Sequence, residues 1–227
     1  MASYRYEILS PRDAAFLAAE GPTTPMHIGA AFVADAGPLA TADGGIDIER
    51  VRDFIAARLH RIPRYRQRVA YTPLRRRPIW VDDRHFKVEF HVRHSALPRP
   101  GDADQLKRLI GRVCAQPLDR GHPLWELWVV EGLEQGRRFA LISKVHHCMV
   151  DGVSSTELLT LLMSALPDDQ IGAGPPYVPR PEPSVAELAR DELVSFALAP
   201  LDAAQSLREL FAPGRRTELG QALRAAA

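Results

Sequence analysis

The sequence predicts an α/β (α+β) lobe, a mixed sheet flanked by helices, followed by a linker and a helical tail. Strand-like and helix-like apolar patterns alternate over residues 1–166, which is typical of helices packed around one sheet. Six of the 19 prolines then lie between Pro167 and Pro183. Because proline removes backbone donors and fixes φ, residues 167–184 indicate an extended linker. Residues 185–227 are rich in Ala, Leu and Arg, and their pattern predicts helix broken at Pro200 and Pro213.

Apolar spacing places the individual elements of residues 1–166. Strands are expected at 27–34, 86–92, 124–133 and 138–147, the last two joined as a hairpin through 134–136. Helices are expected at 48–62, 103–115 and 158–166, because apolar residues recur there every three or four positions. Asp47 is a suitable N-cap for the first helix, and Ser154 with Glu157 forms a capping box before the third.

The composition is that of an ordinary globular protein and excludes several classes. Hydrophobic residues make up 46% and charged residues 25% of the chain, which is wrong for disorder. A net charge of +1 argues against a nucleic-acid partner. The apolar runs are too short to span a bilayer, the first residues lack the apolar core of a secretory signal, and two cysteines make no disulfide framework. We therefore expect a cytoplasmic protein.

The string His146-His147-Cys148-Met149-Val150-Asp151-Gly152 carries the clearest chemistry. It falls where a predicted strand ends and a capped helix begins, a place that commonly presents side chains to a site. On that strand His147 shares a mainly apolar face, whereas His146 accompanies Lys144. Desolvation on an apolar face can keep a histidine neutral, as a general base near pH 7 requires. Asp151 could fix the turn or pair with an arginine, and Gly152 permits an approach that a Cβ would forbid.

The same residues have other interpretations. A histidine on an apolar face is often simply a hydrogen-bonded core residue. A metal site built from both histidines and Asp151 is disfavoured, because neighbouring strand residues point to opposite faces. The same geometry argues against activation of Cys148 by His147 as a nucleophile. We therefore expect no metal, and we interpret Cys148 and Met149 as packing residues.

This string resembles the HHxxxDG motif of the acyltransferases that share the chloramphenicol-acetyltransferase and condensation-domain fold. Two more strings resemble the bacterial wax ester synthase/diacylglycerol acyltransferase family. The first combines Leu9-Ser10-Pro11, Asp13, Phe16 and Glu20 with Thr24-Pro25-Met26-His27-Ile28-Gly29. The second is Pro117-Leu118-Asp119-Arg120 leading into Pro123-Leu124-Trp125-Glu126. The dense part of the resemblance covers about residues 6–166.

The resemblance implies transfer of a fatty acyl group from acyl-CoA to diacylglycerol or a long-chain alcohol, with acyl-CoA as a substrate and no cofactor. It implies that His147 is the general base for the acceptor hydroxyl and that His146 supports the site. Asp151 would bond an arginine from elsewhere in the fold, and Gly152 would leave room for substrate. We add the hypothesis that backbone N–H groups at the start of the helix at 155–166 stabilise the oxyanion.

The resemblance also implies two similar lobes with the active-site tunnel between them. Residues 1–166 correspond to the N-terminal lobe, 167–184 to the inter-lobe linker and 185–227 to the start of a truncated second lobe. The remaining lobe is therefore an expected partner. Two functional classes follow: an acyltransferase or its catalytic half, and an inactive or split half that binds lipid or a partner. The family strings disfavour another HHxxxDG enzyme, such as a condensation domain.

Two further sets of residues are candidates for substrate contact. Met26 and His27 could line the acyl channel or pack in the core. Pro123, Leu124 and Trp125 are candidate substrate-binding residues as well. Trp125 and Trp128 also suit the packing of a core.

A strongly basic stretch is the last feature of interest. From Arg50 to Arg77, ten arginines accompany one acid, Asp53. Arg75, Arg76 and Arg77 are therefore candidates for binding CoA phosphates, or an anionic membrane or lipid-droplet surface. A solvated arginine-rich face is the alternative.

Overall fold

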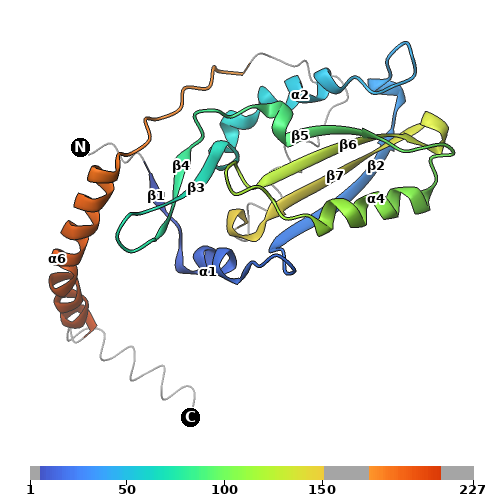
Figure 1. Ribbon diagram of the computed structural model, residues 1–227. Helices are drawn as coiled ribbons and strands as arrows, with labels where there is room; N and C mark the ends of the chain where they lie inside the picture. The colour runs from blue at the N-terminus through green and yellow to red at the C-terminus, as the bar shows by residue number, and fades with distance from the viewer. Residues whose placement is uncertain (1–5, 151–173, 211–227) are drawn as a thin grey trace, which may run out of the picture. The chain divides into compact units, whose positions relative to one another are not determined.

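The computed structural model describes residues 6–150 and 174–210, with side chains up to residue 198 of the last helix (Figure 1). The chain divides into two compact units. The larger contains the chain up to Tyr71 together with Arg77–Glu182, and the smaller contains Thr72–Arg76 and the chain from Pro183 onward. Asp151, Gly152 and the predicted helix at 158–166 with its capping box lie outside the described residues.

A four-stranded sheet is the centre of the larger unit (Figure 1). β6 and β7 form an antiparallel hairpin, β2 pairs antiparallel with β7, and β5 pairs parallel with β6. The sheet is therefore mixed, as the sequence predicts. In the spatial order β2-β7-β6-β5, the strands are β2 (His27–Asp35), β7 (Arg138–His146), β6 (Trp125–Leu133) and β5 (Val92–Ala96).

The remaining elements surround this sheet or belong to the smaller unit. A smaller antiparallel sheet has the order β1 (Glu7–Ile8), β4 (Pro78–Asp82), β3 (Gln67–Tyr71). The helices are α1 (Pro11–Ala19), α2 (Ile48–Ala56), α3 (Val88–His91), α4 (Ala103–Ala115) and α6 (Val185–Leu210). Short 3₁₀ turns are η1 (Gly37–Leu39), η2 (Leu59–Arg61), η3 (Pro63–Arg66), η4 (Glu134–Gly136) and η5 (His147–Met149).

The central strands are buried on both faces. On one face α4 packs Leu109 and Val113 against Ile142 of β7 (Figure 1). On the other face Ile55 of α2 joins Trp125 of β6 in the larger apolar cluster. Burial on both faces holds β7 rigidly, and β7 leads directly into the motif turn.

Local sequence explains where the helices begin. Asp102 accepts the Gln105 backbone N–H at 2.7 Å while the Gln105 side chain returns to the Asp102 N–H, a reciprocal capping box that starts α4. Asp47 accepts the Arg50 N–H at 3.0 Å, which confirms it as the N-cap of α2. The Ser10 hydroxyl accepts the Asp13 N–H at the start of α1.

The predicted strand at 86–92 is wrong. Residues Val88–His91 form one helical turn, and the strand begins only at Val92. The predicted strand placed His91 on its polar, outward face. In the structure its ring is fully buried and stacks on Trp125 with 4.5 Å between the ring centroids. Its Nδ1 donates to the Trp125 carbonyl at 2.9 Å. An imidazole with a satisfied hydrogen bond can thus fill an aromatic core position.

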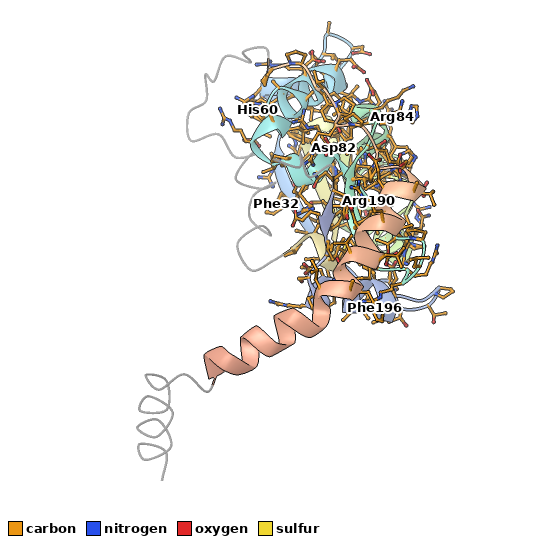
Figure 2. All side chains as sticks on the ribbon, turned by 90° about the vertical axis from the view of Figure 1, so that its left-hand side faces the viewer. Phe32, His60, Asp82, Arg84, Arg190 and Phe196 are labelled. Atoms are coloured by element: carbon orange, nitrogen blue, oxygen red, sulfur yellow. The ribbon has the colours of Figure 1, made fainter. Side chains whose placement is uncertain are left out.

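Two helix ends also differ from the prediction. α2 ends at Ala56 rather than near residue 62, and the 3₁₀ turn at Leu59–Arg61 keeps Leu59 buried. α6 continues through Pro200, where a break was predicted. Proline inside a helix removes one backbone hydrogen bond and bends the helix rather than always ending it. Figure 2 shows that α6 bends along its length.

Gly101 and Gly111 give a matched test of the close approach between the backbones at Gly101 and Gly132. Gly101 has a φ of 73°, and a Cβ there would clash with the Gly132 carbonyl. Gly111 lies within α4, and apart from its own helix backbone nothing lies within 4 Å of a Cβ there. Gly101→Ala should therefore lower the thermal unfolding temperature, whereas Gly111→Ala should stabilise by about 0.5–1 kcal/mol. A Gly101→Ala protein as stable as the wild type would contradict the close approach at Gly132.

Candidate active site

The two motif histidines lie where three chain segments meet. β7 ends at His146, and the turn η5 begins at His147. The backbone N–H of His146 donates to the Leu124 carbonyl, and that of His147 donates to the Met26 carbonyl, both at 2.9 Å. Consecutive residues are therefore held from opposite sides, by the segment before β6 and the segment before β2. Strings that are far apart in the sequence converge on this turn.

His147 presents a half-buried ring beside α1. The ring stacks on Phe16 with 4.7 Å between centroids and 17° between planes. Because His147 lies in the turn rather than on the strand, the alternation of strand faces ends at His146. The stack and the bond to Met26 together fix the ring and the backbone of His147.

His146 is fully buried and has a defined tautomer. Its Nδ1 accepts the Cys148 backbone N–H at 3.0 Å. Because a backbone amide can only donate, Nδ1 carries no proton, and the neutral ring holds its proton on Nε2. Nε2 lies 3.5 Å from Oε1 of Glu20. Burial lowers the pKa of His146 to about 4, although the Glu20 charge partly offsets it. Of the two motif histidines, His146 is therefore the more deeply buried.

Cys148 and Met149 are both buried in the larger apolar cluster, which confirms their interpretation as packing residues. Burial raises the pKa of the Cys148 thiol to about 12. A thiol with that pKa is protonated at neutral pH, so Cys148 is a poor nucleophile.

A cavity of about 930 Å³ lies beside the turn. Ser10, Asp13, Cys148 and Met149 form the part of its wall nearest the motif. The rest of the wall includes four arginines: Arg61, Arg64, Arg66 and Arg180.

Acidic partners hold two of these arginines in place. Arg64 pairs with Glu7 at 2.8 Å and Arg180 with Asp82 at 2.7 Å. Burial alone would raise the pKa of Asp82, but hydrogen bonds from Arg180 and Gln67 lower it to about 2. Figure 2 labels Asp82, whose carboxylate fixes Arg180 of the linker against β4.

The other predicted binding residues make contacts within the protein. The His27 ring donates from Nε2 to the Cys114 carbonyl at 2.8 Å, and burial lowers its pKa. Leu124 and Trp125 are fully buried, and the Trp125 indole donates to the Tyr65 carbonyl at 2.8 Å. This confirms core packing for Trp125. Contact of substrate with Met26, His27 or the Pro123–Trp125 string stays a prediction.

Arg75, Arg76 and Arg77 lie in the connection between β3 and β4. The Arg75 guanidinium lies 5.1 Å from the Phe196 ring centroid, and its backbone N–H donates to Glu192 at 3.1 Å. Arg75 and Arg76 belong to the smaller unit and the motif turn to the larger. A part for these arginines in substrate binding therefore stays a prediction.

No role of their own could be predicted for Glu20 and Arg120 from the sequence. They form an ion pair at 2.8 Å beside His146, although 100 positions separate them. Each lies in one of the family strings, and nothing in the sequence pattern links the two.

Within residues 6–150 and 174–210, no three His, Cys, Asp or Glu side chains gather closely enough to hold a metal ion. No helix in the same residues is both long and apolar enough to cross a membrane.

The buried His146 makes stability depend on pH. Below its ordinary pKa of 6.5 the unfolded chain binds a proton that the folded chain, with a pKa of about 4, does not. The free energy of unfolding therefore falls as the pH drops from about 6.5 to about 4. At pH 5 the loss caused by His146 is about 2 kcal/mol. His146→Asn can keep an acceptor for Cys148 without titrating. It should lose less stability than the wild type between pH 7 and pH 5 in urea unfolding.

The exposed His60 supplies the control for that experiment (Figure 2). His60→Asn should keep the wild-type loss of stability between the two pH values. An equal loss in His146→Asn and the wild type would contradict the neutral, buried state of His146.

Comparison with known proteins identifies the family of this chain. Residues 9–226 match the family model described as "Wax ester synthase/diacylglycerol acyltransferase catalytic domain". The Mycobacterium tuberculosis protein named "Probable diacyglycerol O-acyltransferase tgs3" is 43% identical over 148 residues, which are 65% of this chain and 52% of that protein. Another from the same organism, named "Probable diacyglycerol O-acyltransferase tgs1", is 43% identical over 153 residues, covering 66% and 32% respectively.

Solved structures show the same fold. The wax ester synthase/diacylglycerol acyltransferase from Marinobacter aquaeolei VT8 has a TM-score of 0.61 at 32% identity, covering 85% of this chain and 46% of that one. The tallysomycin biosynthesis protein TlmII has a TM-score of 0.52 at 16% identity, covering 69% and 37% respectively, and shows the fold alone. The chain spans about half the length, or less, of these relatives. Since the family match extends over nearly its whole length, the chain belongs to the wax ester synthase/diacylglycerol acyltransferase family.

Proposed function

We propose that this chain carries the catalytic histidine of an O-acyltransferase that moves a fatty acyl group from acyl-CoA to diacylglycerol or a long-chain alcohol. The observation that carries the proposal is the motif turn. The stack on Phe16 and the backbone bond to Met26 fix a half-buried His147, and the next two residues, Cys148 and Met149, line a cavity. The names of the similar proteins supply the class of substrate.

His147 acts as the general base. It takes the proton from the acceptor hydroxyl as that oxygen bonds to the thioester carbonyl carbon. When the carbon–sulfur bond breaks, the proton passes to the departing CoA sulfur, so the ester and free CoA are the products. The stack on Phe16 and the backbone bond to Met26 hold the ring in one orientation, which lowers the entropic cost of this step.

The remaining motif residues complete the proposal. Asp151 pairs with an arginine and stiffens the turn, and Gly152 leaves space for substrate. Backbone N–H groups at the start of residues 155–166 stabilise the oxyanion. The lining arginines of the cavity favour an anionic substrate such as acyl-CoA.

His147→Ala tests the general base. Loss of such a base typically costs about 10²–10⁴-fold in rate. The assay measures transfer of radiolabelled acyl groups from acyl-CoA to diacylglycerol and to hexadecanol, by the chain alone and mixed with a separately made C-terminal lobe. His60→Ala, which removes an exposed histidine, should keep the wild-type rate.

A folded His147→Ala protein with undiminished turnover would contradict the role of His147 as the general base. No transfer by the wild-type chain, alone or mixed, would favour the alternative class, a non-catalytic half that binds lipid or a partner.

A second candidate function is peripheral binding to an anionic lipid surface, which the exposed side chains of the smaller unit support. Its apolar side chains Leu74, Leu193 and Phe196 are 56%, 59% and 63% exposed. Figure 2 labels Phe196 on α6, and Arg75 lies against the Phe196 ring. Exposed apolar side chains beside arginines are typical of segments that lie on membrane interfaces.

Replacing Arg75, Arg76 and Arg77 with glutamine tests this surface. Each basic residue near an anionic bilayer contributes about 1 kcal/mol, so loss of all three should weaken binding to anionic liposomes by about 100-fold. A control triple variant with Arg108, Arg112 and Arg137 replaced by glutamine removes the same charge from exposed positions elsewhere. Equal liposome binding by both variants would show that the position of the arginines does not matter.

A further inference from the structure

Glu20 lies just beyond the last turn of α1 with a side chain that is only 7% exposed. Both of its carboxylate oxygens are used. Oε1 accepts the Met26 backbone N–H at 3.1 Å. Oε2 accepts two N–H groups of Arg120, from Nε at 3.1 Å and from Nη2 at 2.8 Å.

These contacts connect Glu20 to both motif histidines. Met26 donates its N–H to Glu20 and accepts the His147 N–H with its carbonyl, so a single residue links the carboxylate to the His147 backbone. Nε2 of His146 lies 3.5 Å from the same Oε1, close enough for attraction between charges although no hydrogen bond joins the two atoms. His146 in turn accepts the Cys148 N–H, which shapes the turn after His147.

We propose that Glu20 is a positioning residue that holds His147 through Met26 and, by the charge of its carboxylate, favours the Nε2-protonated form of His146 that the Cys148 N–H selects. The proposal rests on the proposed role of His147 as the general base. Glu20 touches no reacting atom, so it acts only through the geometry of the turn.

Arg120 explains why a carboxylate is tolerated at this buried position. A buried, unpaired carboxylate costs several kcal/mol, whereas a two-point contact with arginine compensates for much of that cost. Burial alone would raise the pKa of Glu20, but the bonds from Arg120 and Met26 hold it below its ordinary value. Arg120 also donates to the Leu17 carbonyl, which ties residues 117–120 to α1.

Two substitutions of Glu20 separate positioning from simple packing. Glu20→Leu removes every acceptor, whereas Glu20→Gln keeps one oxygen for Met26 and His146. Displacement of a catalytic group by about 1 Å costs on the order of 100-fold in rate. Glu20→Leu should therefore lose about that factor in kcat with little change in KM, and Glu20→Gln should recover a substantial part of it.

Glu131 offers a matched control on another part of the sheet. Its carboxylate also accepts one backbone N–H, from Ile46 at 2.9 Å, and lies 3.1 Å from a histidine ring nitrogen, of His94. Glu131→Leu removes a backbone contact and a histidine contact of the same kinds and should leave kcat unchanged.

The second measurement is independent of turnover. Nitrogen-15 NMR of the histidine rings, on the 227-residue chain, should show His146 protonated on Nε2 alone. Glu20→Leu should change the ring signals of both His146 and His147, while Glu20→Gln and Glu131→Leu should leave them close to the wild type. If Glu20→Leu does not fold, Glu20→Ala, which also removes every acceptor, takes its place in the comparison with Glu20→Gln.

Unchanged ring signals in folded Glu20→Leu would overturn the proposal, whatever the activity. Changed ring signals with undiminished kcat would also overturn it, as would an equal loss in Glu131→Leu. If the wild-type chain transfers no acyl group, the proposed function fails, and the ring signals still decide whether Glu20 holds the two histidines.

Discussion

Two backbone hydrogen bonds determine the candidate site: His146 N–H to Leu124 and His147 N–H to Met26. They exist because β7 lies between β2 and β6 in the sheet, so that the end of β7 has a neighbour on each side. Residues before β2 and before β6 thereby bind the turn directly. This explains why three strings that are distant in the chain belong to a single site.

Buried charge sets the register of β7. Lys144 is fully buried, lies 3.2 Å from Glu126 and donates to the Val113 carbonyl at the end of α4. His146, two residues on and on the same face, meets Glu20. A slip of one residue would turn both side chains to the opposite face and leave both carboxylates without these partners. The register that buries His146 is the same one that leaves His147 half-buried beside Phe16.

Much of this arrangement could be predicted from local pattern. α4 has the predicted bounds, Asp47 caps α2, and the β6–β7 hairpin leads into the motif as expected. Local pattern did not predict the features that depend on contacts between residues distant in the sequence. The ring of His91 is a core residue because Trp125 offers both a stacking face and a carbonyl. The Glu20–Arg120 pair could not be found, since its 100-residue separation is closed only by the fold.

The central claim is that the turn at His147 is rigid because its backbone is bound to the strands around it. Amide hydrogen exchange on the 227-residue chain tests this most directly. The His147 and Cys148 amides should exchange as slowly as those in the middle of β7, since each donates a hydrogen bond to an acceptor of the folded chain. Exchange of these two amides at the rate of an exposed loop would contradict the claim.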